Sequence, residues 1–254
     1  MYPHSFFWHY LWIAPQVLLT TVAALMVTRR LHREFPSFFI YTVFQVILNA
    51  VLFFLDHNAS VSWYQYRWAE WVGEILSIGL RFAVIQEIFS VIFRSFPGLK
   101  NLGIVAFRWA LAILGLIAVA VAAHNPGVDY LPHLFAGLAL LDRAIAIMQC
   151  GILLLLFLFS SYFGLSWRSY VFGIATGLGI FSATQLATAA VKAYLGPYPS
   201  DYLIDFVVMG MYHCSVLVWL FYFLVSEPIY PTIRLAPVQD LESWNDELRR
   251  LLQR

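Results

Sequence analysis

Long apolar runs separated by short polar breaks divide the chain into seven segments. The runs cover about 5–28, 36–55, 67–94, 102–123, 134–159, 170–194 and 202–225. Each is roughly 20 residues or longer, which is the length that an α-helix needs to cross a bilayer. The pattern predicts an all-α fold, in which residues 1–227 form one polytopic membrane bundle of seven transmembrane helices.

The breaks between the runs differ in charge. The breaks after the first, third and fifth runs contain basic residues, whereas the other breaks contain almost none; the basic ones are Arg29, Arg30, Arg33, Lys100 and Arg168. Cytoplasmic loops of membrane proteins carry an excess of Lys and Arg. We therefore expect the N-terminus outside and the C-terminus in the cytoplasm. No positive charge precedes the first run, so we expect that helix to be retained rather than cleaved as a signal peptide.

Composition strengthens this picture. The chain is 61% hydrophobic and 11% charged, whereas soluble domains are about 25% charged. The lipid bilayer is therefore the first expected partner. A formal net charge of +1 argues against nucleic acid as a partner, because phosphate binding needs a concentrated excess of Lys and Arg.

The last part of the chain, 228–254, has a different pattern. Three prolines, Pro228, Pro231 and Pro237, exclude a simple continuation of the seventh helix. Beyond them, apolar residues recur at helical spacing among charged ones, which predicts a short amphipathic helix. Such a helix rests on lipid headgroups or docks a cytoplasmic protein partner, and the pattern leaves both open. Its apolar face comprises Leu241, Trp244, Leu248 and Leu251.

The third run, 67–94, carries charges inside an apolar segment, namely Glu70, Glu74, Arg81 and Glu87. A charge near the bilayer centre is costly, so such residues usually face a protein interior and find partners there. Glu70, Glu74, Ser77 and Arg81 are spaced by four, three and four residues and so share one helix face. We expect this helix to be central in the bundle.

Helix direction and depth suggest partners for these charges. The fifth run has the same direction as the third, and it places Asp142 and Arg143 near the depth of Glu74. Charge complementarity then predicts Glu74 with Arg143, and Arg81 with Asp142. At the cytoplasmic side, Glu87 and Arg108 are predicted to form a structural ion pair. Glu70 is left without an obvious cation.

Further polar residues of the second, sixth and seventh runs, Gln45, Asn49, Gln185 and His213, lie at depths where they could complete a polar pocket. Two interpretations stay open. The cluster binds a small ligand or an ion or relays protons, or it is a set of satisfied salt bridges that fix helix register. The candidate ligand-binding or relay residues are Glu70, Glu74, Arg81, Asp142, Arg143, Gln185 and His213.

Motifs for known chemistry give little support for catalysis. Neither lysine, Lys100 or Lys192, lies in the last run, where a retinal Schiff base would need one. His213 is the only histidine deep in a run, which argues against a haem held by two histidines. The histidines expected outside lack metal-ligand spacing; they are His4, His9, His57, His124 and His133. We expect no metal and no cofactor. The sequence also shows no serine or cysteine nucleophile with a base at a recognisable spacing, so it does not indicate an enzyme.

Short stretches resemble known membrane families. Ala14, Pro15 and Gln16 resemble half of the signature of PQ-loop and sugar-exporting transporters, although the fifth run lacks a second Pro-Gln pair. RRLHREFPSFFIYTVFQ (29–45) and FLFSSYFGLSWRSYVFGI (157–174) are similar to stretches in bacterial seven-helix membrane proteins of unassigned function. The second resemblance covers most of the chain and implies a multi-pass protein of the bacterial inner membrane. It brings no catalytic residues with it.

These observations lead to two functional expectations. The first is a non-enzymatic sensory or accessory membrane protein whose polar pocket or tail helix contacts a ligand or partner. The alternative is a small-molecule or proton-coupled transporter that uses Glu74, Arg81 and Asp142.

Overall fold

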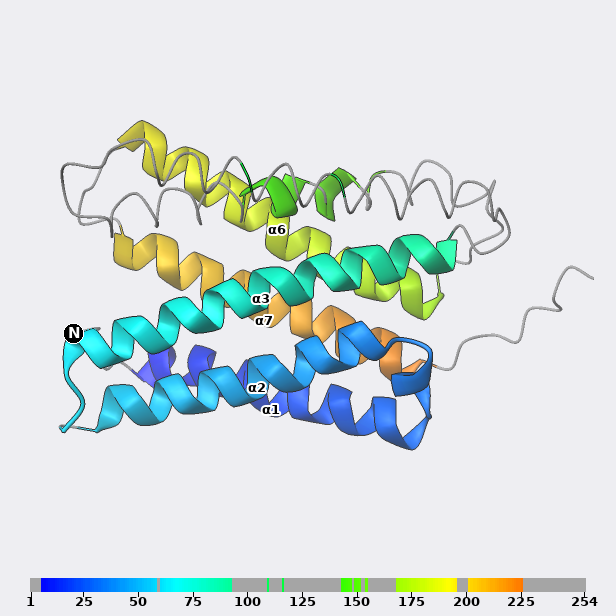
Figure 1. The fold of residues 1–254 in the computed structure, drawn as a ribbon, viewed down its shortest axis with the longest axis horizontal. Coiled ribbons are helices and arrows are strands. Elements are labelled where there is room, and N and C mark those ends of the chain that lie inside the picture. Colours follow the sequence, from blue (N-terminus) through cyan, green and yellow to red (C-terminus); the bar gives the residue numbers. More distant parts are fainter. Residues whose placement is uncertain are drawn as a thin grey trace, which may run out of the picture.

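The computed structural model describes residues 6–58, 60–92, 168–195 and 201–225, together with 109, 116, 143–147, 149–151 and 154. All regular secondary structure in these residues is helical, so the predicted all-α class is confirmed for them (Figure 1). The elements are α1 (Phe6–Thr28), η1 (Leu31–Arg33), α2 (Pro36–His57), α3 (Trp63–Ile92), α6 (Tyr170–Leu195) and α7 (Asp201–Leu224).

Four of the described helices are long and apolar enough to cross a membrane: α1, α2, α6 and α7. Their spans agree with the first, second, sixth and seventh apolar runs of the sequence. The 30-residue α3 is not in this set, since its charges interrupt the apolar run. It begins at Trp63, one turn earlier than the sequence predicted.

The other predicted elements lie mostly or wholly outside the described residues. Residues 143–147 and 149–151 are helical, as the predicted helix 134–159 requires. The predicted helix 102–123 is described only at 109 and 116, and the tail helix, with its apolar face of Leu241, Trp244, Leu248 and Leu251, is not described. A total of seven helices therefore stays a prediction.

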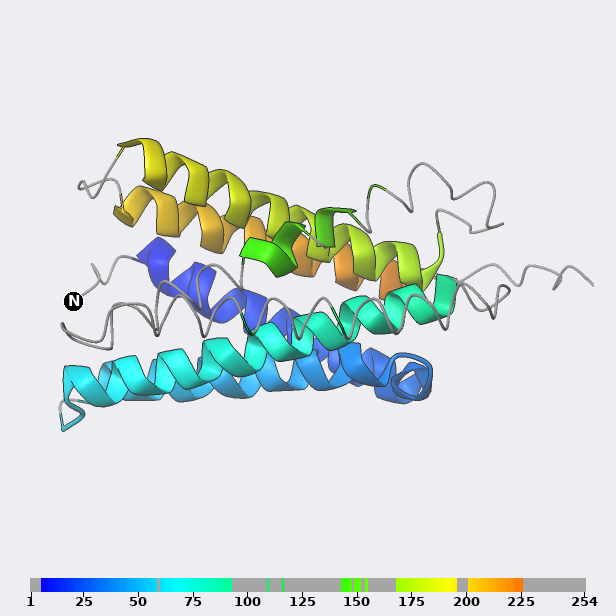
Figure 2. The same ribbon diagram turned by 45° about the horizontal axis from the view of Figure 1, so that its top comes forward.

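The long helices pack side by side, and packed neighbours run in opposite directions except α1 and α7, which run in the same direction (Figures 1 and 2). α2 packs against both α1 and α3, α1 also packs against α7, and α7 packs against α6. α3 and α6, at the two ends of this series, also meet but share much less contact. The series thus curves back on itself, and α3 and α6 make less contact than the neighbouring pairs of described helices within it.

The two ends of the bundle differ in charge. At one end α1 and α7 finish while α2 and α6 begin (Figure 1), and this arginine end contains Arg29, Arg30, Arg33 and Arg168. At the opposite end, which we name the cavity end, α1, α3 and α7 begin and α2 finishes. The asymmetry agrees with the charge pattern from which the membrane orientation was predicted.

Glu87 of α3 caps the N-terminus of α2 at the arginine end. Its carboxylate accepts hydrogen bonds from the backbone N–H groups of Ser37, at 2.9 Å, and Phe38, at 3.0 Å. These N–H groups lack partners within their own helix, and the positive end of the helix dipole favours an anion there. The sequence predicted an ion pair with Arg108 and missed this cap; Arg108 lies outside the described residues.

Arg29 holds three elements together at the same end. One guanidinium nitrogen donates to the carbonyl of Leu224 at 3.1 Å, and another lies 3.5 Å from the hydroxyl of Tyr170. A cation at the end of α7 also complements the negative end of that helix dipole. The next residue, Arg30, has a φ of 59°, a left-handed conformation that lets the chain turn sharply after α1.

Aromatic rings fill the interior near the arginine end. Phe38 of α2 stacks on Phe223 of α7 at 5.8 Å and meets the edge of Trp219 at 5.2 Å. Trp219 donates its indole N–H to a carbonyl of α6, and a Cβ on Gly177 would overlap its ring. Gly173 and Gly177 therefore allow the close packing of α6 against α7.

Candidate functional site

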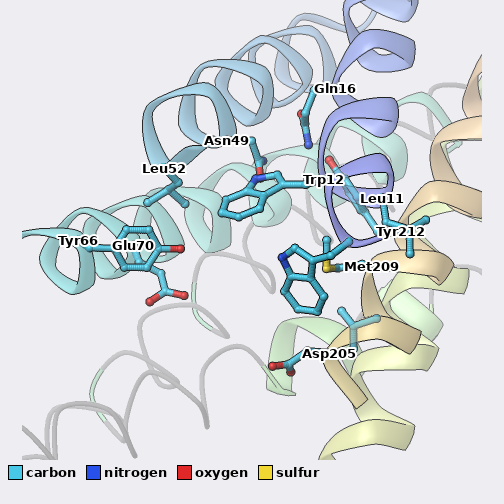
Figure 3. A pocket seen from close by; sticks show the side chains of 12 residues that line it. Leu11, Trp12, Gln16, Asn49, Leu52, Tyr66, Glu70, Asp205, Met209 and Tyr212 are labelled. Carbon is cyan, nitrogen blue, oxygen red and sulfur yellow. The ribbon is translucent and has the colours of Figure 1, made fainter. Parts of the chain in front are cut away.

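Two cavities lie between the helices toward the cavity end. The larger one, which we name the end cavity, has a volume of about 320 Å³ and is lined by side chains from α1, α2, α3 and α7 (Figure 3). Glu70 of α3 and Asp205 of α7 reach it from different helices. Other lining residues are Trp8, Trp12, Gln16, Tyr66 and Tyr212.

A second cavity, which we name the deep cavity, has a volume of about 200 Å³. It is lined by residues of α2, α3, α6 and α7, among them Gln45, Glu74, Arg81 and Gln185. Both cavities include Asn49, Val208, Met209 and Tyr212 in their lining. The two spaces are therefore neighbours separated by shared side chains, one near the cavity end and the other further inside.

Arg81 is the central cation of the deep cavity. It is 1% exposed. Its guanidinium group donates hydrogen bonds to the Glu74 carboxylate at 3.1 Å and to the side-chain amide oxygen of Gln185 at 2.9 Å. A buried guanidinium group needs such partners because its desolvation is costly. The hydrogen bond to Gln185 also joins α3 to α6, which otherwise share little contact.

Glu74 and Arg81 have partners that the sequence analysis did not assign to them. Glu74 and Arg81 contact each other within one helix, two turns apart, whereas the sequence analysis assigned each a partner from the fifth run. Arg143 is exposed, and Asp142 lies outside the described residues. The shared stripe on α3 was visible in the sequence, but a seven-residue separation was not considered as a pair.

Polar residues of α2 complete the wall as expected. Gln45 donates its amide N–H to the Ser77 hydroxyl at 2.6 Å, and both residues are buried. Asn49, one turn further along, donates to the Gln45 backbone carbonyl at 2.9 Å. Together with Gln185, these residues form part of the predicted polar pocket.

Glu70 has a cation that the sequence analysis did not assign to it. Arg67, one turn earlier, contacts the Glu70 carboxylate at 2.6 Å. The Arg67 guanidinium group also lies 5.6 Å from the ring of Trp63 and 5.7 Å from that of Trp71. The expectation that Glu70 lacked a cation was therefore wrong.

His213 does not line either cavity, although it was a candidate. Its ring lies 5.8 Å from the ring of Tyr10 on α1. The Nδ1 atom is buried and has no hydrogen-bond partner among the described residues. The sequence placed this histidine at a suitable depth but could not tell which way α7 is turned.

The cavities contain residues that the sequence analysis did not select. Neither Asp205 nor Tyr212 was among the candidate residues. The Tyr212 hydroxyl and the side-chain amide oxygen of Gln16 are buried without a hydrogen-bond partner in the described part of the chain. Aromatic residues make up 18% of the sequence, so abundance alone gave no signal for those that line a cavity.

Within the described residues, no group of three or more His, Cys, Asp or Glu side chains could hold a metal ion. His9 and His57 lie together at the cavity end with ring centroids 5.6 Å apart. The other histidines predicted outside, His4, His124 and His133, lie beyond the described ranges.

Comparison with known proteins adds no relative. No protein-family model, curated protein or solved structure matches the chain.

Proposed function

We propose that the protein is a non-enzymatic sensory protein of the bacterial inner membrane, which binds a small polar ligand in the two cavities. In this proposal it has seven transmembrane helices with the N-terminus outside. The observation that carries the proposal is the position of the end cavity at the end of the bundle opposite the arginine end, with the deep cavity beside it further inside. Because arginine-rich ends face the cytoplasm, the end cavity would open to the outer side.

The deep cavity offers the chemistry that such recognition needs. Its polar groups are held in place by one another, as in the contacts of Arg81 with Glu74 and Gln185. Small-molecule sites typically combine an apolar wall with a few convergent polar groups that fix the ligand orientation. A preorganised site of this kind loses little conformational freedom on binding.

Close packing at the arginine end favours a sensor over a transporter. Phe38, Trp219 and Phe223 are all fully buried there and contact one another. A passage to the cytoplasm along this part of the interior would require those rings to separate. A sensor needs access from one side only.

A transporter remains the second candidate, because α3 and α6 share little contact. Their link between Arg81 and Gln185 is polar, and an alternating opening could break and remake it. This candidate would use the charges of Glu74 and Arg81, with Asp142 as the further acid predicted from sequence.

Accessibility of a cysteine between the cavities tests the proposal. Met209→Cys lines both cavities, and the native thiols Cys150 and Cys214 are first replaced by serine. A membrane-impermeant thiol reagent is applied outside intact spheroplasts and, separately, to inverted vesicles. We expect labelling from the outer side only.

The matched control is Val216→Cys on the same helix, which is 0% exposed and should react from neither side. Labelling of Met209→Cys from both sides would favour the transporter. Labelling from neither side, or from the cytoplasm alone, would reject an outward-opening site.

The tail can be tested separately. We also propose that Leu241, Trp244, Leu248 and Leu251 form a surface that contacts lipid headgroups or a cytoplasmic protein. Affinity purification in mild detergent would compare the full chain with one truncated after Pro237. A partner that copurifies only with the full chain supports protein docking, whereas membrane association of the isolated tail without such a partner supports headgroup contact.

A further inference from the structure

The charged side chains that line the end cavity are all acidic among the described residues. Its described lining contains two carboxylates, Glu70 and Asp205, and no Lys or Arg. Arg67 contacts one oxygen of Glu70 but does not belong to the lining. In the deep cavity, by contrast, both members of an ion pair, Glu74 and Arg81, belong to the lining. The two cavities therefore favour different ligand groups, and the end cavity favours a cation.

Aromatic rings accompany these carboxylates. Trp8 and Trp12 come from α1, Tyr66 from α3 and Tyr212 from α7. The face of an indole or phenol ring attracts a cation, and the attraction is strongest where water is excluded. Carboxylates combined with aromatic faces are suited to an ammonium group, which needs both counter-charge and a polarisable wall.

Two buried oxygen atoms on the same lining add hydrogen-bonding capacity. The side-chain amide oxygen of Gln16 and the Tyr212 hydroxyl have no hydrogen-bond partner within the described part of the chain. Figure 3 shows Gln16 and Tyr212 on the side of the cavity away from Glu70. A ligand N–H or hydroxyl group can donate to the Gln16 oxygen, and satisfying such a buried acceptor favours binding.

We propose that the end cavity binds a small organic cation, with its ammonium group near Glu70 and Asp205 and against the rings of Trp8 and Trp12. This inference rests on the proposed function and specifies its ligand class. The volume of about 320 Å³ falls at the lower end of the range for small-molecule sites. The lining disfavours a free anion, because two carboxylates would repel it.

The charge of the cavity can be measured without knowing the natural ligand. In the Met209→Cys protein, the reaction rate is compared for two methanethiosulfonate reagents, one bearing a trimethylammonium group and the other a sulfonate. The ratio of the two rates is normalised to Ser60→Cys, an exposed position in the connection between α2 and α3. We expect the cationic reagent to be favoured by about tenfold or more, because a cleft of one charge sign concentrates the opposite ion.

Asp205→Asn and Glu70→Gln then identify the source of that preference. Each change removes one negative charge with little change of shape, so each should lower the normalised ratio severalfold. The matched control is Asp56→Asn, an acid of α2 outside both linings, which should leave the ratio within twofold of the parent. A normalised ratio near one in the parent protein would overturn the proposal.

Binding is tested with choline and with its neutral isostere, in which a carbon atom replaces the nitrogen. Choline at millimolar concentration should slow the reaction of Met209→Cys with a neutral thiol reagent by at least threefold, and the isostere should not. Equal protection by the two compounds, or no protection by either, would overturn the cation assignment. The proposed outward-opening site would fail on a different result, namely the absence of labelling from the outer side.

Discussion

The arginine end and the cavity end are built from the same helices, yet one is filled and the other is hollow. In α2, Phe38 near the arginine end is buried among other rings, whereas Asn49 and Leu52 near the cavity end line open space. In α7, Trp219 and Phe223 are fully buried, while Asp205 lines the end cavity. Each helix thus combines a packing half with a binding half.

This difference assigns stability and recognition to separate parts of the molecule. Close packing makes any loss of volume costly, because neighbouring atoms relax only partly into the space. Side chains around an existing cavity make fewer contacts, so their removal costs less. Substitutions at the two ends should therefore have clearly different effects on unfolding and on binding.

The largest difference is expected between two tryptophans. Trp219→Ala should lower the free energy of unfolding by about 4 kcal/mol, the cost typical of a buried aromatic residue, because Trp219 is 0% exposed and bonded to α6. Trp12→Ala, in the end cavity, should cost about 1 kcal/mol, since surface substitutions cost still less and core ones far more. Unfolding by denaturing detergent, followed by circular dichroism, measures both. Equal losses would remove the distinction between the two ends.

The next effect tests how much the polar contacts of Arg81 in the deep cavity contribute to the free energy of unfolding. Arg81→Met keeps an unbranched chain but removes the contacts of the guanidinium group with Glu74 and Gln185. We expect a loss of about 3 kcal/mol, at the lower end for a broken buried ion pair, because the Glu74 side chain is 45% exposed.

Gln185→Leu serves as the comparison for Arg81→Met, because it breaks only the bridge to α6 and leaves the ion pair of α3 intact. It should cost less than Arg81→Met in the same unfolding assay. If Arg81→Met unfolds like the parent protein, the pair does not stabilise the fold, and its charge serves recognition alone.

A smaller effect is expected at the cap of α2. Glu87→Ala removes an acceptor from the N–H groups of Ser37 and Phe38 and should cost about 1–2 kcal/mol. Glu70→Ala, on the same helix but at the cavity end, should cost less than about 1 kcal/mol, because its ion pair with Arg67 is partly exposed. Hydrogen exchange at the first turn of α2 should rise in the Glu87 variant only, and a rise in both variants would contradict the assignment of this cap.

The smallest effect should be a gain. Arg30→Gly replaces a residue with φ of 59° by the one that adopts this conformation without a steric penalty. We expect a stabilisation of about 0.5–1 kcal/mol, from the removal of left-handed strain, reduced by the greater freedom of glycine in the unfolded chain. Arg33→Gly, at a position with no positive φ, should destabilise in the same assay. Destabilisation by Arg30→Gly would mean that the Arg30 side chain contributes more than the strain costs.

The sequence predicted the helices well because membrane spans depend on length and hydropathy alone. The bounds of α1, α2, α6 and α7 follow the apolar runs closely. Depth along a helix was also predictable, which is why Gln45, Asn49 and Gln185 were selected for the polar pocket.

Rotation of each helix about its own axis was harder to predict. His213 and Tyr212 are adjacent in the sequence and equally deep, yet only Tyr212 lines the cavities. A helix that is apolar on all sides gives little indication of which face is buried. For the same reason the partners of Glu74 and Glu87 could not be assigned from charge and depth, because both depend on how α3 is turned toward its neighbours.

The cap on α2 also bears on the order in which the chain is assembled. The amides of Ser37 and Phe38 leave the ribosome about 50 residues before their acceptor, Glu87. Until Glu87 has been synthesised, that end of α2 must rely on water or lipid headgroups, because unpaired amides are unstable in hydrocarbon. The helical hairpin of α2 and α3, rather than α2 alone, is thus the smallest unit in which the amides of Ser37 and Phe38 have their acceptor during insertion.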